Sequence, residues 1–285
     1  AAVLYPPHWL FSWLAPAQAL GWSALLHIWL AALLMFAFGR RGLGLSRPAA
    51  WLAAALFAFG GFTLGKIENI NQLNALAWLP GLLWCFAAAR QAADRRGRVR
   101  AGAALSALIA LQILAGHAQT AFVNLVGLAL FALVTARLPG LWGKAAARQA
   151  VAHVTAQLWP LLTVGPALLL AAAQLLPTLE LNSLGLRTAG LTYRLAVSFS
   201  LRPRLLAQTF LPPLGGGLAE AFGSEGYAEF TGYIGMVGLI LAGLGGFCLL
   251  RRLPTIEPPA RAMLAGLALV GGAGVFLALG AYNPV

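Results

Sequence analysis

Three side chains that can carry out acid–base chemistry lie in short polar stretches between long apolar runs. They are Glu68 in KIENIN, His117 in LAGHAQTAF and Glu180 in PTLEL. A positioned carboxylate or imidazole can take a proton from a hydroxyl group, and polar groups at membrane depth are costly enough that they usually line a cavity. We therefore expect these candidate catalytic residues to face one outer cleft. The alternatives are a solvated loop carboxylate for Glu68, a helix-end carboxylate for Glu180 and a helix cap for His117.

Polar side chains in the same outer segments can bind a substrate. The candidate substrate-binding residues are Lys66, Asn69, Gln119, Arg187, Arg194 and Tyr233. An arginine presents a planar fork of N–H groups that matches phosphate oxygens, so the basic members of this set suit a lipid phosphate or pyrophosphate. Contact with ordinary lipid headgroups would use the same side chains, and this alternative stays open.

The sequence contains no strong pattern of metal ligands. Glu220, Glu225 and Glu229 are spaced five and four apart in a glycine-containing loop, but this loop lacks the Asp and Asn residues of a calcium-binding loop. We predict no metal site, and the cofactor is unknown, although a divalent metal would suit an enzyme. His27 lies in the first apolar run. It would ligate a pigment or haem or, as histidines between membrane helices more often do, form a hydrogen bond.

The composition places the chain in a membrane. Hydrophobic residues make up 60% of the sequence, charged residues only 9%, and the mean hydropathy is +0.82, whereas soluble domains carry about 25% charged residues. A net charge of +12 would suggest nucleic-acid binding by a soluble protein. In a membrane protein the position of the basic residues matters more. We therefore expect a single membrane domain in contact with the lipid bilayer and with no nucleic acid.

Eight apolar runs approach the length of about 17–25 helical residues that a bilayer crossing requires. They cover residues 17–38, 49–65, 75–89, 101–116, 120–136, 155–176, 231–250 and 262–280. The predicted fold is all-α: one polytopic transmembrane helical bundle of about eight spans over residues 1–285, with a long extracytoplasmic loop at 177–230. Pro212 and Pro213 in that loop exclude one continuous helix.

Basic residues segregate to alternate loops in this arrangement. Fourteen of the 19 fall on one side, in residues 40–47, 90–100, 137–148 and 251–261. Because Lys and Arg are retained on the cytoplasmic side, this asymmetry predicts eight crossings of the bacterial cytoplasmic (inner) membrane, with both ends of the chain on the extracytoplasmic side. We attribute the basic loops to topology and to attraction by anionic lipid rather than to a specific partner.

Seven stretches distributed over nearly the whole chain form an ordered set. They are LYPPHWLF, LLHIWLAALLMFAFGRRGLGLSRPAAWLAAALFAFGGF, NALAWLPGLLW, LAGHAQTAF, AAAQLLPTLEL, EFTGYIGMVGLILA and FLALGAYNPV. In this order they resemble the YfhO-type bacterial membrane proteins, a family related to the GT-C glycosyltransferases. The resemblance implies the transfer of a sugar from a polyprenyl-phosphate carrier to an acceptor at the outer face of the membrane.

The resemblance also implies where a catalytic carboxylate would lie. GT-C enzymes generally use a carboxylate of the first outer loop as a base or as a ligand of a divalent metal, and in the YfhO pattern that loop precedes YPPHWLF. We therefore expect the acid to lie upstream of residue 1, in a longer protein, or to be absent. Two functions stay open: a GT-C-type glycosyltransferase, and a non-catalytic structural or accessory subunit of a larger complex with membrane protein partners. A lipid flippase is a weaker third. His117 would shape the cleft rather than act as the base.

Overall fold

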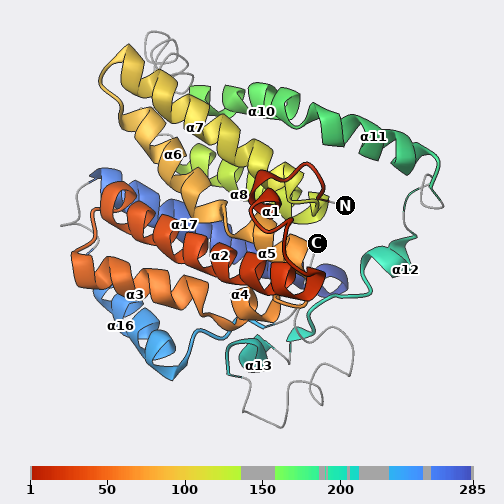
Figure 1. Cartoon of the computed structure of the whole chain (residues 1–285). Coiled ribbons are helices and arrows are strands. Elements are labelled where there is room, and N and C mark those ends of the chain that lie inside the picture. Colours follow the sequence, from red (N-terminus) through yellow and green to blue (C-terminus); the bar gives the residue numbers. More distant parts are fainter. Residues whose placement is uncertain are drawn as a thin grey trace, which may run out of the picture.

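The computed structural model of the chain describes residues 2–135, 158–185, 190, 192–203, 206–211, 231–252 and 258–283. Over these residues the chain forms helices and turns and contains no β-strand. This confirms the predicted all-α class. Figure 1 shows the long helices packed side by side. Such an arrangement suits a bilayer, where each helix satisfies its own backbone polar groups.

The first two long helices form a hairpin. α2 (Pro16–Ala37) continues into a π-helical turn, η1 (Phe38–Gly42), and α3 (Arg47–Ala58) follows. The side chain of Ser46 caps α3 by accepting a hydrogen bond from the N–H of Ala49. Three alanines spaced four residues apart are buried on α3, namely Ala50, Ala54 and Ala58. Small residues at this spacing let two membrane helices approach closely, and α2 and α3 lie side by side (Figure 1).

A broken helix follows and forms the most buried of the candidate spans. It comprises α5 (Ile70–Leu76) and α6 (Leu79–Gln91), which come after the short α4 (Gly61–Gly65). Pro80 explains the break, because a proline has no N–H to donate to the carbonyl group four residues earlier, where α5 ends.

The helices α7 (Arg95–Leu114) and α8 (Ala118–Thr135) follow and are joined by a tight turn; α7 packs along α6, whereas α8 packs along a later helix. The carboxylate of Asp94 caps α7 by accepting a hydrogen bond from the N–H of Gly97, at 3.0 Å. The main hydrophobic core lies where α6, α7 and α8 meet, and its largest side chains include Phe86, Leu105, Ile109, Leu128 and Phe131.

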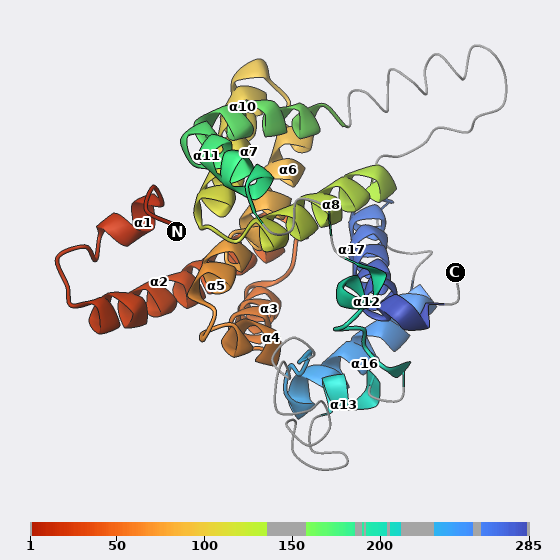
Figure 2. The same ribbon diagram turned by 90° about the vertical axis from the view of Figure 1, so that its right-hand side faces the viewer.

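A bent pair of helices lies on the same side of the bundle as α6 and α7, away from α16 (Met236–Arg252) and α17 (Pro258–Ala278) (Figures 1 and 2). The pair begins with a 3-10 turn, η2 (Trp159–Thr163), and α10 (Val164–Leu170). α11 (Ala172–Ser183) then departs at an angle of 76°. The remaining short elements are α1 (Pro6–Trp9), α12 (Tyr193–Ala196), α13 (Leu206–Phe210) and η5 (Gly280–Tyr282).

Six of the eight predicted spans match helices that are long and apolar enough to cross a membrane. These helical segments are Pro16–Gly42, Arg47–Gly65, Ile70–Gln91, Arg95–Leu114, Ala118–Thr135 and Arg261–Ala278. The predicted span 231–250 corresponds to a shorter helix that begins only at Met236. The described residues therefore contain six candidate spans, or seven if the bent pair counts as one, and the total of eight stays a prediction.

The predicted boundary at residue 176 is wrong. The described part of the span 155–176 is bent at Ala171, and α11 continues to Ser183, so the predicted loop 177–230 starts inside a helix. The sequence LLLAAAQLL has no glycine or proline at the bend. Sequence rules for helix-breaking residues could not place it.

Helix α17 packs against α8 at a glycine. A Cβ atom on Gly266 would lie 2.9 Å from both the Phe131 ring and the Thr135 methyl group. Both neighbours are buried. Thr135 is also fixed by Arg90, whose Nη2 donates to the Thr135 carbonyl oxygen at 2.9 Å. The two helices can approach this closely only because residue 266 has no side chain.

We expect Gly266→Ala to destabilise the protein by about 1–3 kcal/mol, because the added methyl group overpacks a region whose side chains are fixed. Gly271 on the same helix is the matched control, since a Cβ atom there meets nothing within 4 Å. Gly271→Ala should stabilise the helix by up to about 1 kcal/mol, because alanine has the higher helix propensity. Thermal unfolding in detergent measures both effects. Equal unfolding midpoints for the two variants would contradict this packing.

Candidate functional site

The three candidate catalytic residues occupy separate elements. Glu68 is exposed in the connection between α4 and α5, and Glu180 is exposed within α11 rather than beyond the end of a helix. These two segments lie on different sides of the molecule in both views (Figures 1 and 2). Over the described residues, no three His, Cys, Asp or Glu side chains lie close enough to hold a metal ion. The described carboxylates do not fit a metal centre, and the catalytic roles of these residues stay predictions.

His117 caps the helix that follows it. Its Nδ1 accepts a hydrogen bond from the N–H of Thr120 at 3.1 Å and lies 2.8 Å from the Thr120 hydroxyl group. The preceding residue, Gly116, has φ of +83°, which favours glycine. The turn between α7 and α8 therefore has the geometry that the structural interpretation of GHAQT predicts.

The candidate binding residues differ in their surroundings. Lys66 is fully buried, with its Nζ 5.1 Å from the centre of the Phe62 ring. Asn69, Gln119 and Arg194 are exposed, and Tyr233 is partly buried. Arg187 and the three glutamates of the predicted loop, Glu220, Glu225 and Glu229, lie outside the described residues.

A buried chain of hydrogen bonds joins α1, α2 and the junction of α5 with α6. The indole N–H of Trp78 donates to the Tyr5 hydroxyl oxygen at 2.8 Å, and that hydroxyl group lies 2.6 Å from Nε2 of His27. Nδ1 of His27 lies 2.6 Å from the Ser23 carbonyl oxygen, which can only accept, so Nδ1 carries the proton and Nε2 accepts from Tyr5. Both ring nitrogens of His27 are occupied. This is the interhelical hydrogen bonding expected of it and leaves no nitrogen for a pigment or haem.

A second set of polar groups extends this network. Nδ2 of Asn74 lies 2.8 Å from Nε2 of His8 and donates to the Ser23 hydroxyl group at 3.4 Å. The Tyr5 and His8 rings meet edge to face, with centres 5.0 Å apart. We call the six residues Tyr5, His8, Ser23, His27, Asn74 and Trp78 the N-terminal network. It consists of neutral donors and acceptors, and none of its members is a carboxylate.

The N-terminal network borders a cavity of about 360 Å³ at the start of α2. His8, Ser12 and Ser23 supply its polar wall, while Phe11 and Leu20 are among its apolar lining. This volume lies near the lower end of the roughly 300–1,000 Å³ typical of small-molecule sites. A pocket with a few convergent polar groups in an apolar wall is the usual form of such a site.

Two buried carbonyl oxygens lie on or against α5 without a hydrogen-bond partner among the described residues. One is Oδ1 of Asn74, and the other is Oε1 of Gln112, whose Nε2 donates to the Ala75 carbonyl oxygen at 2.8 Å. Unpaired buried acceptors are rare and costly in folded proteins. Both side chains are fully buried and neither lines the cavity, so these two acceptors face the protein interior.

Sequence reasoning missed five members of the N-terminal network, namely Tyr5, His8, Ser23, Asn74 and Trp78. The available signal was that Tyr and Trp carry one polar group on an apolar body, and that group usually finds a partner when buried. The partners come from segments up to 73 residues apart, and no local pattern could pair them.

Comparisons with protein-family models, curated proteins and solved structures found no match.

Replacing Tyr5 by phenylalanine should destabilise the protein by about 2–4 kcal/mol, because the Trp78 N–H and the His27 Nε2 would each remain buried without a partner. Tyr193→Phe is the matched control, since Tyr193 is exposed on α12. Thermal unfolding in detergent compares the two variants. If both unfolded at the wild-type temperature, the Tyr5 hydroxyl group would have no structural role.

Stability should fall as the pH is lowered. Burial lowers the pKa of His8 below its ordinary value near 6.5, although a backbone hydrogen bond to Ala2 partly opposes this effect. The unfolded chain therefore binds a proton at a higher pH than the folded chain, and folding loses free energy as the pH falls below about 6.5. We expect the unfolding temperature to decrease from pH 7.5 to pH 5.5, and to decrease less in His8→Gln. Identical slopes would show that His8 titrates alike in both states.

Proposed function

We propose that this protein acts on a lipid-linked sugar at the extracytoplasmic face of the bacterial cytoplasmic membrane. In this proposal it transfers the sugar from a polyprenyl-phosphate donor to an acceptor hydroxyl group, as the GT-C glycosyltransferases do. The segregation of basic residues would put the N-terminal network and its cavity on the extracytoplasmic side.

One observation carries the proposal. Three of the stretches on which the YfhO resemblance rests supply one connected network: LYPPHWLF contributes Tyr5 and His8, the stretch beginning LLHIWL contributes His27, and NALAWLPGLLW contributes Asn74 and Trp78. Stretches chosen from the sequence alone thus share a site. If the stretches resembled the family only because they are apolar, there would be no reason for their polar residues to meet. Their meeting therefore favours a functional resemblance.

A fourth of these stretches meets the one that contributes His27. The N–H of Gly61, in FAFGGF, donates to the carbonyl oxygen of Tyr233, in EFTGYIG, at 2.6 Å. A Cβ atom on Gly61 would lie 2.6 Å from the Thr231 methyl group. This contact supports the same functional resemblance, because Thr231 in one stretch leaves no room for a side chain at Gly61 in the other.

The chemistry of the cavity suits a sugar. Its serine and histidine side chains can exchange hydrogen bonds with hydroxyl groups, and the apolar part of its wall can contact the ring or the first units of a prenyl chain.

The reaction needs a base, and Glu68 is the described carboxylate that we assign to this role. It lies in the connection that leads directly into α5, the helix that carries Asn74 of the N-terminal network. Glu68 would take the proton of the acceptor hydroxyl group while the oxygen of that hydroxyl group attacks the anomeric carbon of the sugar. The bond from that carbon to the phosphate oxygen would break, and polyprenyl phosphate would leave with the bonding electrons.

A non-catalytic accessory subunit is the second candidate function, and α11 favours it. This apolar helix turns away from α10 by 76°, and none of its side chains is buried against the rest of the described structure. Leu181 and Leu184 are 69% and 78% exposed. A projecting apolar helix of this kind can pack against a partner membrane protein as well as against lipid.

The test uses the full chain, purified in detergent and returned to lipid vesicles. It is supplied with polyprenyl phosphates that carry radiolabelled glucose, galactose or N-acetylglucosamine, and transfer or release of the label is measured. We expect Glu68→Gln to reduce the rate by about 10²–10⁴-fold, the usual contribution of a general base. Glu180→Gln is the matched control and should keep the wild-type rate.

Two results would contradict the proposal. Equal rates for wild type and Glu68→Gln would remove Glu68 from catalysis. A wild-type protein that processes none of the three donors, and that purifies from its native membrane in a fixed ratio with another membrane protein, would establish the accessory function instead.

A further inference from the structure

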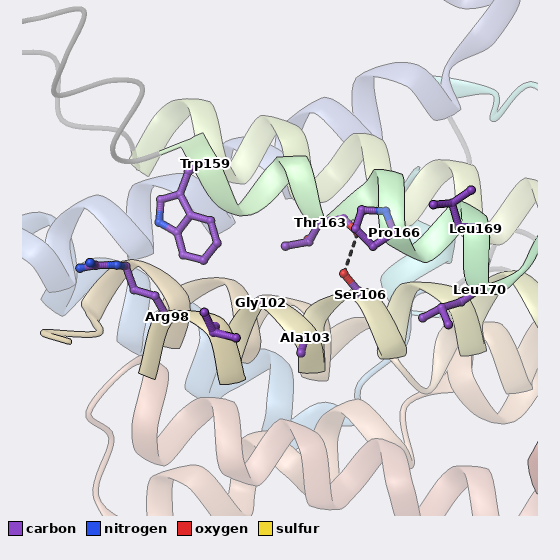
Figure 3. A pocket seen from close by; sticks show the side chains of 10 residues that line it. Arg98, Gly102, Ala103, Ser106, Trp159, Thr163, Pro166, Leu169 and Leu170 are labelled. Atoms are coloured by element: carbon purple, nitrogen blue, oxygen red, sulfur yellow. Dashed lines mark hydrogen bonds between the residues drawn. The ribbon is translucent and has the colours of Figure 1, made fainter. Parts of the chain in front are cut away.

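A long apolar groove separates α7 from η2 and α10. It has a volume of about 670 Å³, and its lining includes Gly102, Ala103, Leu169 and Leu170 (Figure 3). Its central polar contact is already satisfied, because the Ser106 hydroxyl group donates to the Thr163 carbonyl oxygen at 2.8 Å. The groove therefore offers its occupant an apolar surface and no free polar group along its middle.

One end of the groove is marked by a tryptophan and an arginine. Figure 3 shows Trp159 and Arg98 together at this end, opposite Leu169 and Leu170. Tryptophan prefers the boundary between hydrocarbon and headgroups, and arginine binds phosphate oxygens with a planar fork. One end of the groove is thus apolar, and the other end suits the boundary between the hydrocarbon and the lipid headgroups.

More arginines continue from this end. Arg95, Arg96 and Arg100, together with Val99, line a second depression of about 450 Å³. Val99 also lines the groove, so the two hollows adjoin. A cluster of four arginines therefore borders the end of an apolar groove.

This cluster differs from three other arginines that the charge pattern assigns to the same side of the membrane. Arg41 stacks on Trp84, Arg251 stacks on Phe247, and Arg90 donates to Thr135. Within the described part of the chain, by contrast, the side chains of the four clustered arginines make no ion pair, hydrogen bond or ring contact with the protein. Their charge remains available to a ligand.

We propose that this groove is a binding site for one anionic phospholipid of the leaflet that the basic loops face. An acyl chain lies along Ala103 and Leu169, and the phosphate is held by Arg98 with its arginine neighbours. Basic pockets between membrane helices bind anionic headgroups in this way. The site is separate from the N-terminal network and does not depend on sugar transfer.

General attraction of basic loops to anionic lipid makes a different prediction. It would act on every exposed arginine of this side alike, whereas a built site requires both the groove and the particular arginine at its end. Arg98→Gln removes a phosphate ligand, and Ala103→Phe fills the groove while leaving the charge unchanged. Arg251→Gln is the matched control, because it removes an equal charge from the same side but outside the groove.

Native mass spectrometry of the full chain in mild detergent provides the test. Each variant is titrated with phosphatidylglycerol, with phosphatidylcholine and with polyprenyl phosphate. We expect wild type to retain one phosphatidylglycerol in preference to the other two lipids. We expect Arg98→Gln to weaken this binding about fivefold, in line with roughly 1 kcal/mol for each basic residue at a membrane surface. Ala103→Phe should weaken it at least as much, and Arg251→Gln should bind like wild type.

Three results would overturn the proposal. One is equal retention of phosphatidylglycerol and phosphatidylcholine, and another is tighter binding of polyprenyl phosphate than of phosphatidylglycerol. The third is an equal loss of binding in Arg98→Gln and Arg251→Gln, which would attribute the effect to general charge. Arg98 is exposed, so its replacement tests binding without disturbing the core, and circular dichroism verifies the helical content of each variant.

Discussion

The Tyr5 hydroxyl group is the point at which the N-terminal half of the bundle is tied together. It accepts a hydrogen bond from Trp78 and donates one to His27, so a single oxygen atom connects α1, α2 and the junction between α5 and α6. In an apolar interior each of these polar groups would be costly without a partner. Apolar helix surfaces alone do not fix how the helices pack, whereas these hydrogen bonds require Tyr5, His27 and Trp78 to meet. The hydrogen bonds of Tyr5 therefore restrict the relative positions of α1, α2 and the junction between α5 and α6 more than apolar packing does.

The sequence predicts the local features of this fold well. Apolar runs locate six helices that are long enough to cross a membrane, because length and hydrophobicity alone decide whether a segment can do so. The tight turn at Gly116 and the capping by His117 are also predictable, since both depend on residues within a few positions of one another. His27 is correctly assigned to interhelical hydrogen bonding for a similarly simple reason: a polar group in an apolar span needs a partner.

The remaining features depend on contacts between distant residues. A helix that is apolar on all sides has no face that indicates its neighbour, so the partners of His27 and Asn74 could not be named from the sequence. The 76° bend before α11 has no breaker residue at its position. The full burial of Lys66 is also unexpected, because the charged residue lies in a stretch that resembles a solvated loop. The predicted cleft shared by Glu68 and Glu180 rests only on the prediction that both residues lie on the same side of the membrane. Being on one side does not determine how far apart two residues are.

The N-terminal network also fixes the position of a segment that reaches the far end of α7. Its members lie between Tyr5 and Trp78. Ala2, three residues before Tyr5, packs in one apolar cluster with Ala115, and a Cβ atom on Gly116 would lie 3.3 Å from the Ala2 side chain. The segment that carries Tyr5 is therefore held at two points, by hydrogen bonds to His27 and Trp78 and by apolar contact beside the turn before α8. One buried hydroxyl group thus also positions the residues that cover the end of α7.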